Sequence, residues 1–263
     1  MINNLVIGSD GFIGNYFCKY LESIGEHVIR FDIKRGENED GRFAVLDFKN
    51  IDRIYFLAWD VGGAKYLYKE DAQAYQLEWN LKLLNNLMPQ IGKSAKPFLF
   101  ISSQLAEECD TAYGVTKRLG EVWTRILGGV FIRQWNVYGP IENNDLRSHV
   151  ISDFISQAIA TKEIRMITTG EEKRQFIHID DVCKAWYKAL NENLEGIYDI
   201  TSFEWVKISD VANIIAKLTG ARVIAGDKIG STPITPIKGK IPGWVPIVNL
   251  EDGLKLMIDD FNK

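Results

Sequence analysis

The chain has 263 residues, enough for a sizeable hydrophobic core and for one or two domains. Its formal net charge of −4 and its pI near 5.5 argue against nucleic acid as a partner, so any phosphate binding must come from local features. The three cysteines are far apart and form no metal-binding pattern with the three histidines, which argues against a disulfide framework and a zinc site. No apolar run reaches the length of a membrane span, and the first strand is expected from Asn4, so we expect a cytoplasmic protein without a membrane partner.

Segments with the patterns of buried strands and of amphipathic helices alternate along the first half of the chain. The expected strands are 4–8, 27–32, 42–48, 53–59, 97–103 and 128–140, and the expected helices are 12–25, 72–90 and 112–127. This alternation predicts a parallel sheet with helices on both faces, an α/β fold of the Rossmann-type doubly wound kind. The connection between the third and fourth strands is too short for a helix, so we expect one crossover to be a bare loop.

After Pro140 the pattern becomes more irregular and predicts a second, smaller part of the protein. The expected elements are a helix over 148–160, a strand over 164–168, a helix capped by Asp180 and Asp181 after a packed His178, a strand over 196–201, a helix from the N-cap Ser209 to 220, loops over 221–249 and a helix from about Leu250. We therefore expect a doubly wound domain from residues 1–139 plus about 175–202. A smaller C-terminal lobe is expected from about 140–174 plus 203–263.

Three glycines stand directly after the first expected strand, at the opening of the first helix. Gly8, Gly11 and Gly14 leave room for a tight turn and for the close approach of a pyrophosphate, and a helix N-terminus favours an anion. The same letters in a loop would indicate only a turn. Because a strand precedes them and a helix follows, they predict a dinucleotide site.

Asp32 ends the second expected strand, 18 residues after the last of these glycines. A carboxylate at this place can accept both hydroxyls of a ribose and repels a 2′-phosphate, which favours NAD over NADP. Lys34 and Arg35 lie close by and weaken that preference, and the alternative interpretation of Asp32 is a solvated strand end. Asp47, at the end of the third expected strand, is predicted to contact the adenine amino group or to be a simple turn residue.

Tyr113 and Lys117 lie four residues apart on one face of an expected helix, and Ser103 ends the strand before that helix. A phenol has an unperturbed pKa of about 10 and is a poor base at neutral pH, but a nearby ammonium and a bound nicotinamide cation would lower that pKa. Ser103 would then hydrogen-bond the substrate oxygen whose proton Tyr113 takes or returns. The alternative interpretation, an exposed helix surface, is disfavoured by the strand end just before the pair.

The order of these motifs resembles that of the extended short-chain dehydrogenase/reductases, specifically the NAD-dependent epimerase/dehydratase group that acts on nucleotide sugars. The resemblance covers almost the whole chain and includes GSDGFIG, LAWDVGG, YGVTK, FIRQWNVYGP, RQFIHIDDV and GWVPIVNLEDGLK. It implies that the larger domain binds NAD and that the smaller lobe binds a nucleotide-diphosphate sugar. It also implies a homodimer, formed through a four-helix bundle of helices 72–90 and 112–127 from two copies.

The resemblance implies a role for each motif residue by its position. Ser103, Tyr113 and Lys117 are the catalytic trio. The cofactor-binding residues are Gly8, Gly11, Phe12, Ile13, Gly14, Asp32, Asp47, Leu57, Ala58, Tyr113 and Lys117. The substrate-binding residues are Ser103, Gln104, Asn136, His149 and Arg174, of which Arg174 grips the diphosphate. No metal ligand is implied.

His149 is open to two interpretations. The segment RSHVISDFI and the pair Gly62–Gly63 resemble the GDP-fucose synthase branch, in which the histidine acts as an acid in 3,5-epimerisation. The partner cysteine of that branch falls at Leu105, so the double epimerisation is not expected. The alternative is that His149 only begins a helix.

Two departures from the family pattern bear on the reaction. The catalytic serine and tyrosine are 10 positions apart, where the extended family usually has a longer loop, so the pocket is expected to be more open. Gln104 and Leu105 stand where the 4,6-dehydratases have an Asp–Glu pair, which argues against water elimination. Glu107 and Glu108 lie near enough to keep that reaction as an alternative.

The sequence thus predicts an NAD-dependent epimerase or oxidoreductase that transfers hydride at C4 of a nucleotide-activated hexose. An NAD(P)H-dependent reductase of 4-keto sugar nucleotides is the first alternative. A 4,6-dehydratase and a non-catalytic dinucleotide-binding sensor are the others. The sensor is disfavoured because such proteins typically lose the tyrosine–lysine pair, which this chain retains.

Overall fold

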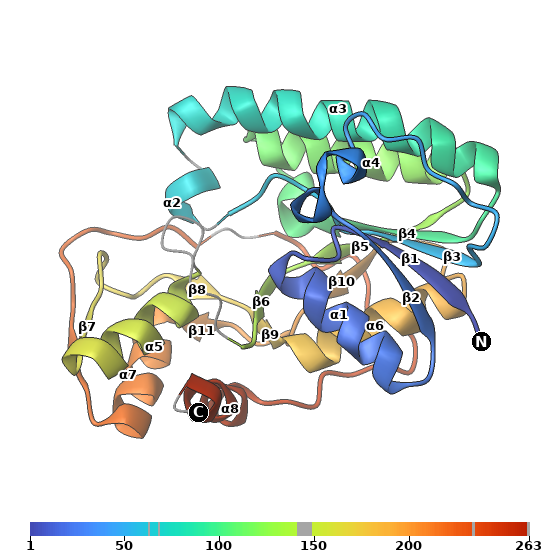
Figure 1. The fold of residues 1–263 in the computed structure, drawn as a ribbon. Coiled ribbons are helices and arrows are strands. Elements are labelled where there is room, and N and C mark those ends of the chain that lie inside the picture. Colours follow the sequence, from blue (N-terminus) through green and yellow to red (C-terminus); the bar gives the residue numbers. More distant parts are fainter. Residues whose placement is uncertain (63, 68, 141–148, 233–234, 262–263) are drawn as a thin grey trace.

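Six parallel strands form the central sheet of the computed structural model, which describes residues 1–62, 64–67, 69–140, 149–232 and 235–261 (Figure 1). The strands are β1 (Asn3–Ile7), β2 (His27–Phe31), β3 (Arg53–Phe56), β4 (Phe98–Ser103), β5 (Val130–Gln134) and β10 (Tyr198–Ile200). They lie in the order β10-β5-β4-β3-β1-β2. The winding direction changes between β1 and β3, and a doubly wound sheet forms its ligand crevice at the carboxyl ends of the strands at such a point. The expected fold class is confirmed.

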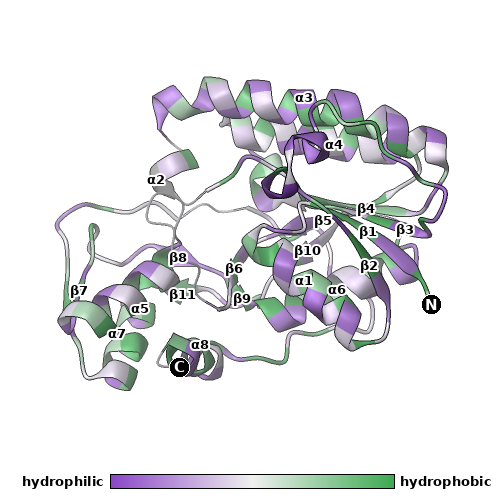
Figure 2. Ribbon diagram, in the orientation of Figure 1, coloured by the Kyte–Doolittle hydropathy of each residue, from purple (hydrophilic) through white to green (hydrophobic). Residues whose placement is uncertain are grey.

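Helices cover both faces of this sheet because their apolar sides need burial (Figure 1). They are α1 (Phe12–Ser23) and α6 (Ile179–Asn191) on one face, and α3 (Glu70–Ser94) and α4 (Ala112–Ile126) on the other. Phe17 and Trp186 pack on Tyr55 beneath the first pair, whereas Leu84 of α3 belongs to a second core with Phe56 of β3. The central strands carry mostly hydrophobic residues, and the helices alternate hydrophobic and hydrophilic positions (Figure 2). This is the pattern of a sheet that is buried on both sides.

A smaller group of elements, seen at the lower left of Figure 1, has its own hydrophobic core. It comprises α5 (Val150–Thr161), α7 (Ile208–Thr219), α8 (Leu250–Phe261) and the two-stranded sheets β6 (Asn136–Tyr138) with β9 (Phe176–His178), β7 (Glu163–Arg165) with β12 (Arg222–Ile224), and β8 (Lys173–Arg174) with β11 (Val206–Lys207). Ile155, Val211 and Met257 meet in that core. Ile241 and Trp244 instead pack in the core beneath α1 and α6, so the C-terminal segment contributes to both parts. The domain boundaries stay a prediction.

The expected strand over 42–48 is wrong. β2 is the last strand of the sheet and pairs only with β1, and segment 42–48 adds no further strand along its free edge. Ala44 and Leu46 still pack beside α3. The backbone of this segment forms hydrogen bonds with side-chain amides of α3 and not with a neighbouring strand: Asn86 donates to the Ala44 carbonyl, and Gln90 accepts from the Leu46 N–H. The β2–β3 crossover is therefore a long connection with the short helices η1 (Ile33–Arg35) and η2 (Glu37–Glu39).

Two smaller expectations also need correction. The segment 128–140 is not one strand: β5 lies in the central sheet, whereas β6 turns away after Trp135 to pair with β9. Ser209 is not the N-cap of its helix, because α7 begins one residue earlier, with Lys207 at the capping position. The remaining short elements are α2 (Ala64–Leu67) and η3 (Gln104–Ala106). In the described parts of the chain we find no helix that is long and apolar enough to cross a membrane.

Asp180 and Asp181 have structural roles, as expected, although the cap of α6 is His178, whose Nδ1 accepts from the Asp180 N–H. Asp180 accepts the hydroxyl of Tyr16 at 2.6 Å. Asp181 is fully buried, and its Oδ2 accepts the N–H groups of Ile247 and Val248, each at 2.9 Å. One carboxylate therefore ties the segment before α8 to the start of α6.

We expect Asp181→Ala to lower the free energy of unfolding by about 1–3 kcal/mol, because two backbone donors lose a charged acceptor. Asp210→Ala is the control, since Asp210 also lies in the first turn of a helix but is exposed. Its loss is expected to cost less than about 1 kcal/mol. Urea unfolding followed by circular dichroism measures both, and equal losses would contradict this role of Asp181.

Candidate active site

One cleft of about 1000 Å³ runs from the carboxyl ends of β1 and β2, past the end of β4, to the smaller group of elements. Each predicted site residue except Asp47 lines it: Gly8, Gly11, Phe12, Ile13, Gly14, Asp32, Leu57, Ala58, Ser103, Gln104, Tyr113, Lys117, Asn136, His149 and Arg174. The fold thus brings together residues that are more than 160 positions apart.

The glycine loop between β1 and α1 is too tightly packed for side chains. Gly8 has a φ of +93°, and a Cβ there would lie 2.5 Å from the backbone nitrogen of Ala58. A Cβ on Gly14 would lie 1.9 Å from the Gly8 carbonyl oxygen. Gly11 is the N-cap of α1 and brings no side chain to the N–H groups of its first turn. Those donors and the helix dipole suit the pyrophosphate of a dinucleotide, so the loop fits the predicted cofactor.

Asp32 is mostly buried at the end of β2, with both carboxylate oxygens fixed by backbone donors. Oδ2 accepts from the Asp10 N–H and Oδ1 from the Lys34 N–H, each at 3.0 Å. The backbone N–H of Asp32 donates to Glu39, so a second carboxylate lies at this end of the cleft. The charge of Arg35 is shared with Asp10 and Glu39.

Asp47 lies away from the cleft, contrary to its predicted contact with adenine. Its carboxylate is exposed and accepts from the backbone N–H of Lys49. This hydrogen bond is typical of a turn residue, which was the alternative interpretation of Asp47. Segment 42–48 forms no strand of the sheet, so Asp47 does not stand at a strand end beside the crevice. Asp40 and Gly41 line the cleft on this side instead.

Ser103 and Tyr113 meet where β4 ends and α4 begins. The Thr111 hydroxyl caps α4 by accepting from the Gly114 N–H, which places Tyr113 in the first turn. Burial raises the pKa of Tyr113 to about 12, and its hydrogen bond with Ser103 opposes that rise. Ser103 also accepts from the Leu105 N–H at 3.2 Å. A protonated phenol and a hydroxyl therefore lie side by side in the wall of the cleft.

Lys117 is 3% exposed, one helical turn beyond Tyr113. Its Nζ donates to the Ile101 carbonyl at 2.6 Å and lies 4.0 Å from the ring centroid of Trp59 and 5.0 Å from that of Phe100. Burial lowers the pKa of Lys117 well below its usual value, and the charge of Glu121 opposes this. Burial has the largest effect on the pKa of both groups, and the lowering of the Tyr113 pKa expected beside Lys117 and a bound nicotinamide cation stays a prediction.

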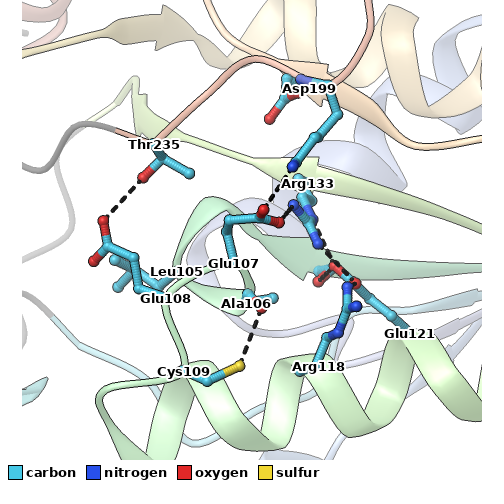
Figure 3. Close-up of polar contacts among 12 residues, drawn as sticks. Leu105, Ala106, Glu107, Glu108, Cys109, Arg118, Glu121, Arg133, Asp199 and Thr235 are labelled. Carbon is cyan, nitrogen blue, oxygen red and sulfur yellow. Dashed lines mark hydrogen bonds and ion pairs between the residues drawn. The ribbon is translucent and has the colours of Figure 1, made fainter.

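A buried network of charged groups centres on Arg133 and Glu121 (Figure 3). Arg133 of β5 donates through Nε and Nη2 to both oxygens of Glu121, at 2.8 and 3.0 Å, and Ser102 donates to the same carboxylate at 2.7 Å. Glu107 bridges Arg133 and Lys238, which lower its pKa, Lys238 having the larger effect. The network joins β4, β5, α4 and the short segment after Ser102 and Ser103.

Glu107 is thus turned away from the cleft, and Glu108 lies 3.4 Å from the hydroxyl of Thr235 (Figure 3). Neither glutamate lines the cleft, whereas Gln104 does. The buried Oε1 of Gln104 has no hydrogen-bond partner among the described residues, so it offers an acceptor beside Ser103. The acids that kept dehydration as an alternative are therefore not placed to act on a ligand.

The remaining residues that are predicted to bind substrate also line the cleft. Asn136 donates to the Gln175 carbonyl, and Arg174 donates to backbone carbonyls that include that of Ser231. His149 is the N-cap residue of α5 and makes no side-chain capping bond. Gly62 also lines the cleft; Gly63 and the part of RSHVISDFI before His149 lie outside the described residues.

Trp59 and Glu172 are among the cleft residues that sequence reasoning missed. Trp59 belongs to the quoted LAWDVGG segment, but its contact with Lys117 joins β3 to α4 and has no local signal. Glu172 stands two positions before Arg174, and its burial depends on distant segments. The one sequence signal for Glu172 was its place close to Arg174, which was predicted to bind the diphosphate.

The fold and the residues in this cleft place the protein in the short-chain dehydrogenase/reductase class. A family model described as "NAD dependent epimerase/dehydratase family" matches residues 4–201. The chain belongs to this family of enzymes, which confirms the resemblance of its motifs and the dependence on NAD as a family property.

Similar proteins differ in their reactions. The chain is 24% identical to dTDP-4-dehydro-6-deoxy-D-allose reductase of Streptomyces bikiniensis, over 82% of this chain and 81% of the relative. It is also 24% identical to GDP-mannose 3,5-epimerase 1 of Oryza sativa subsp. indica, over 95% and 79% respectively. The crystal structure of UDP-glucose 4-epimerase with UDP-glucose from Thermotoga maritima has a TM-score of 0.79 at 22% identity and covers 99% of both chains. The first two matches support nucleotide-sugar modification, and the third shows the fold.

We expect Glu107→Gln to reduce stability and not chemistry. Removing its charge weakens its links to Arg133 and Lys238, which should cost about 1–2 kcal/mol of unfolding free energy, with turnover changed by less than about threefold. Glu108→Gln is the control and should change both quantities less. A loss of about a hundredfold in turnover at unchanged stability would instead make Glu107 a catalytic acid.

Proposed function

We propose that the protein is an NAD-dependent epimerase or oxidoreductase that transfers hydride at C4 of a nucleotide-diphosphate hexose. The observation that carries this proposal is the position of Ser103 and Tyr113 in the cleft, between the glycine loop at one end and Arg174 at the other. Residues 1–139 plus about 175–202 would hold the cofactor. Residues of about 140–174 plus 203–263 would hold the sugar nucleotide.

Tyr113 is proposed to exchange a proton with the 4-oxygen of the hexose. Its high pKa keeps the phenol protonated at neutral pH, which suits donation to a 4-keto oxygen as it becomes a hydroxyl. In the reverse direction Tyr113 must lose its proton, and Ser103 favours that form by hydrogen bonding. A bound nicotinamide would supply the hydride acceptor or donor for C4. Lys117, whose Nζ is held by the Ile101 carbonyl and lies 5.7 Å from the ring centroid of Tyr113, would help to position the phenol.

Two carboxylates at the adenosine end support NAD over NADP. Asp32 and Glu39 both line that end of the cleft, and a 2′-phosphate would meet their negative charge. The basic residues that weakened this preference have other partners: Arg35 pairs with Asp10 and Glu39, and Lys34 donates to the Asp10 carbonyl.

The reductase alternative is supported by the relative from Streptomyces bikiniensis that is named as a reductase of a 4-dehydro sugar nucleotide. Both reactions use the same residues and differ in whether the cofactor is recycled or exchanged. Dehydration is disfavoured, since Gln104 and Leu105 offer no acid or base in the cleft. The retained trio of Ser103, Tyr113 and Lys117 disfavours a sensor.

The test is a panel of UDP-, dTDP-, GDP- and CDP-hexoses, each incubated with the enzyme and NAD or NADH and analysed by mass spectrometry. We expect a product of unchanged mass, or one that differs by two hydrogens. Tyr113→Phe should lower that turnover by about a hundredfold or more with NAD binding retained. Tyr16→Phe, which removes a hydroxyl bonded to Asp180 outside the cleft, is the control and should stay active. A product lighter by one water, or an active Tyr113→Phe variant, would contradict the proposal.

A homodimer through α3 and α4 is also proposed. Val115, Leu119, Val122 and Ile126 recur along one side of α4, and their exposed fractions lie between 36% and 72%. Their spacing makes an apolar stripe of the kind that packs against another helix. Two copies joined along such stripes would form the four-helix bundle implied by the family.

Leu119→Lys should therefore convert the dimer to a monomer, because it places a charge within the stripe. Ile24→Lys is a matched control, since Ile24 has a similar exposed fraction of 43% but follows α1. Sedimentation velocity at micromolar concentration distinguishes the two states. A monomeric wild-type protein, or a dimeric Leu119→Lys variant, would contradict this interface.

A further inference from the structure

Glu172 is a buried carboxylate in the wall of the cleft, near Arg174, and no step proposed above uses it. Glu172 is only 8% exposed and is one of the residues that line the cleft. Oε1 accepts the hydroxyl of Thr168 at 2.6 Å. Oε2 is buried and has no hydrogen-bond partner among the described residues. Half of this carboxylate is therefore left for another donor.

The surroundings of Glu172 hold it in place without neutralising it. The backbone of Gly230 packs directly on the Glu172 carboxylate. A Cβ on Gly230 would lie 2.3 Å from the carboxyl carbon of Glu172. Its own carbonyl accepts from the Ile208 N–H at 3.0 Å, which fixes it to the start of α7. The nearby Lys207 pairs with Glu171 at 2.8 Å. Because a buried carboxylate is costly unless donors surround it, a ligand with N–H groups would complete this site.

The position of Glu172 indicates which part of the ligand it meets, an argument that rests on the proposed function. With the hexose at Tyr113 and the diphosphate at Arg174, the nucleoside would occupy the end of the cleft farthest from the glycine loop. Glu172, Thr168 and Met166 line the cleft and lie between β7 and β8, in the smaller group of elements and not in the part that carries the glycine loop. A carboxylate there would face the edge of the nucleobase.

The common bases differ sharply in what they present to a carboxylate. Guanine carries N1–H and the 2-amino group side by side, and two parallel N–H donors match two carboxylate oxygens. Uracil and thymine have a single N3–H between two carbonyl oxygens, which a carboxylate repels. Cytosine presents its amino group next to an acceptor nitrogen. We propose that Glu172 accepts the N1–H and 2-amino donors of guanine, so that the enzyme takes a GDP-hexose.

Binding of free nucleotides to the intact protein tests this without turnover. Isothermal titration with GDP, UDP, dTDP and CDP should show GDP binding at least about tenfold more tightly than the others. Inosine diphosphate lacks the 2-amino group and should bind about tenfold more weakly than GDP, a comparison that needs no variant. Glu172→Gln should remove the preference for GDP and leave UDP affinity nearly unchanged. Glu171→Gln, an exposed neighbour, is the matched control and should keep the preference.

Equal affinity of the wild-type protein for GDP and UDP would overturn the proposal, as would tighter binding of CDP. An equal loss for all four nucleotides in Glu172→Gln would also overturn it, because it would indicate a contact with ribose or a purely structural role. If GDP is preferred but no GDP-hexose is converted, the base assignment stands and the proposed chemistry fails. If only a UDP- or dTDP-hexose is converted, the chemistry stands and the base assignment fails.

Discussion

The buried ion pair between Arg133 of β5 and Glu121 of α4, together with the hydrogen bond from Ser102 of β4 to Glu121, fixes the strand end that carries Ser103 against the helix that carries Tyr113. Both side chains are almost fully enclosed, at 1% and 0% exposure, and two hydrogen bonds join them. Two charges without water lose much hydration energy, so such a pair persists only when further donors and acceptors complete it. Ser102 supplies one of these and Glu107 another. Removing one partner would leave the other charge buried, at a cost of about 3–5 kcal/mol.

The same network determines what the short segment after β4 can do. Glu107 is drawn toward Arg133 and Lys238, and η3 packs so closely on α4 that a Cβ on Gly114 would lie 2.5 Å from the Leu105 carbonyl oxygen. Gln104 is left as the residue of η3 that brings a polar side chain to the cleft. One network of charges therefore both fixes the position of η3 and engages the side chain of Glu107.

Sequence patterns predicted the parts of the site whose structure depends on residues close together in the chain. The glycine loop, Asp32 and the Tyr113–Lys117 pair were predicted because strand, turn and helix signals surround them in sequence. The strand predicted over 42–48 is absent because its apolar residues pack beside α3 without a strand partner, and Asp47 is the turn residue of its alternative interpretation. The aromatic enclosure of Lys117 and the burial of Glu172 were not predictable, since each depends on segments brought together only by the fold.

The most direct test of the account is the isotope effect at the proposed reacting carbon. A nucleotide hexose that the enzyme converts would be prepared with deuterium at C4 and, separately, at C5, and turnover would be compared with the unlabelled compound in the direction that oxidises the 4-hydroxyl. The account predicts a primary isotope effect for deuterium at C4, with transfer of the label to the nicotinamide, and none for deuterium at C5. An isotope effect confined to C5, with no label reaching the cofactor, would contradict hydride chemistry at C4.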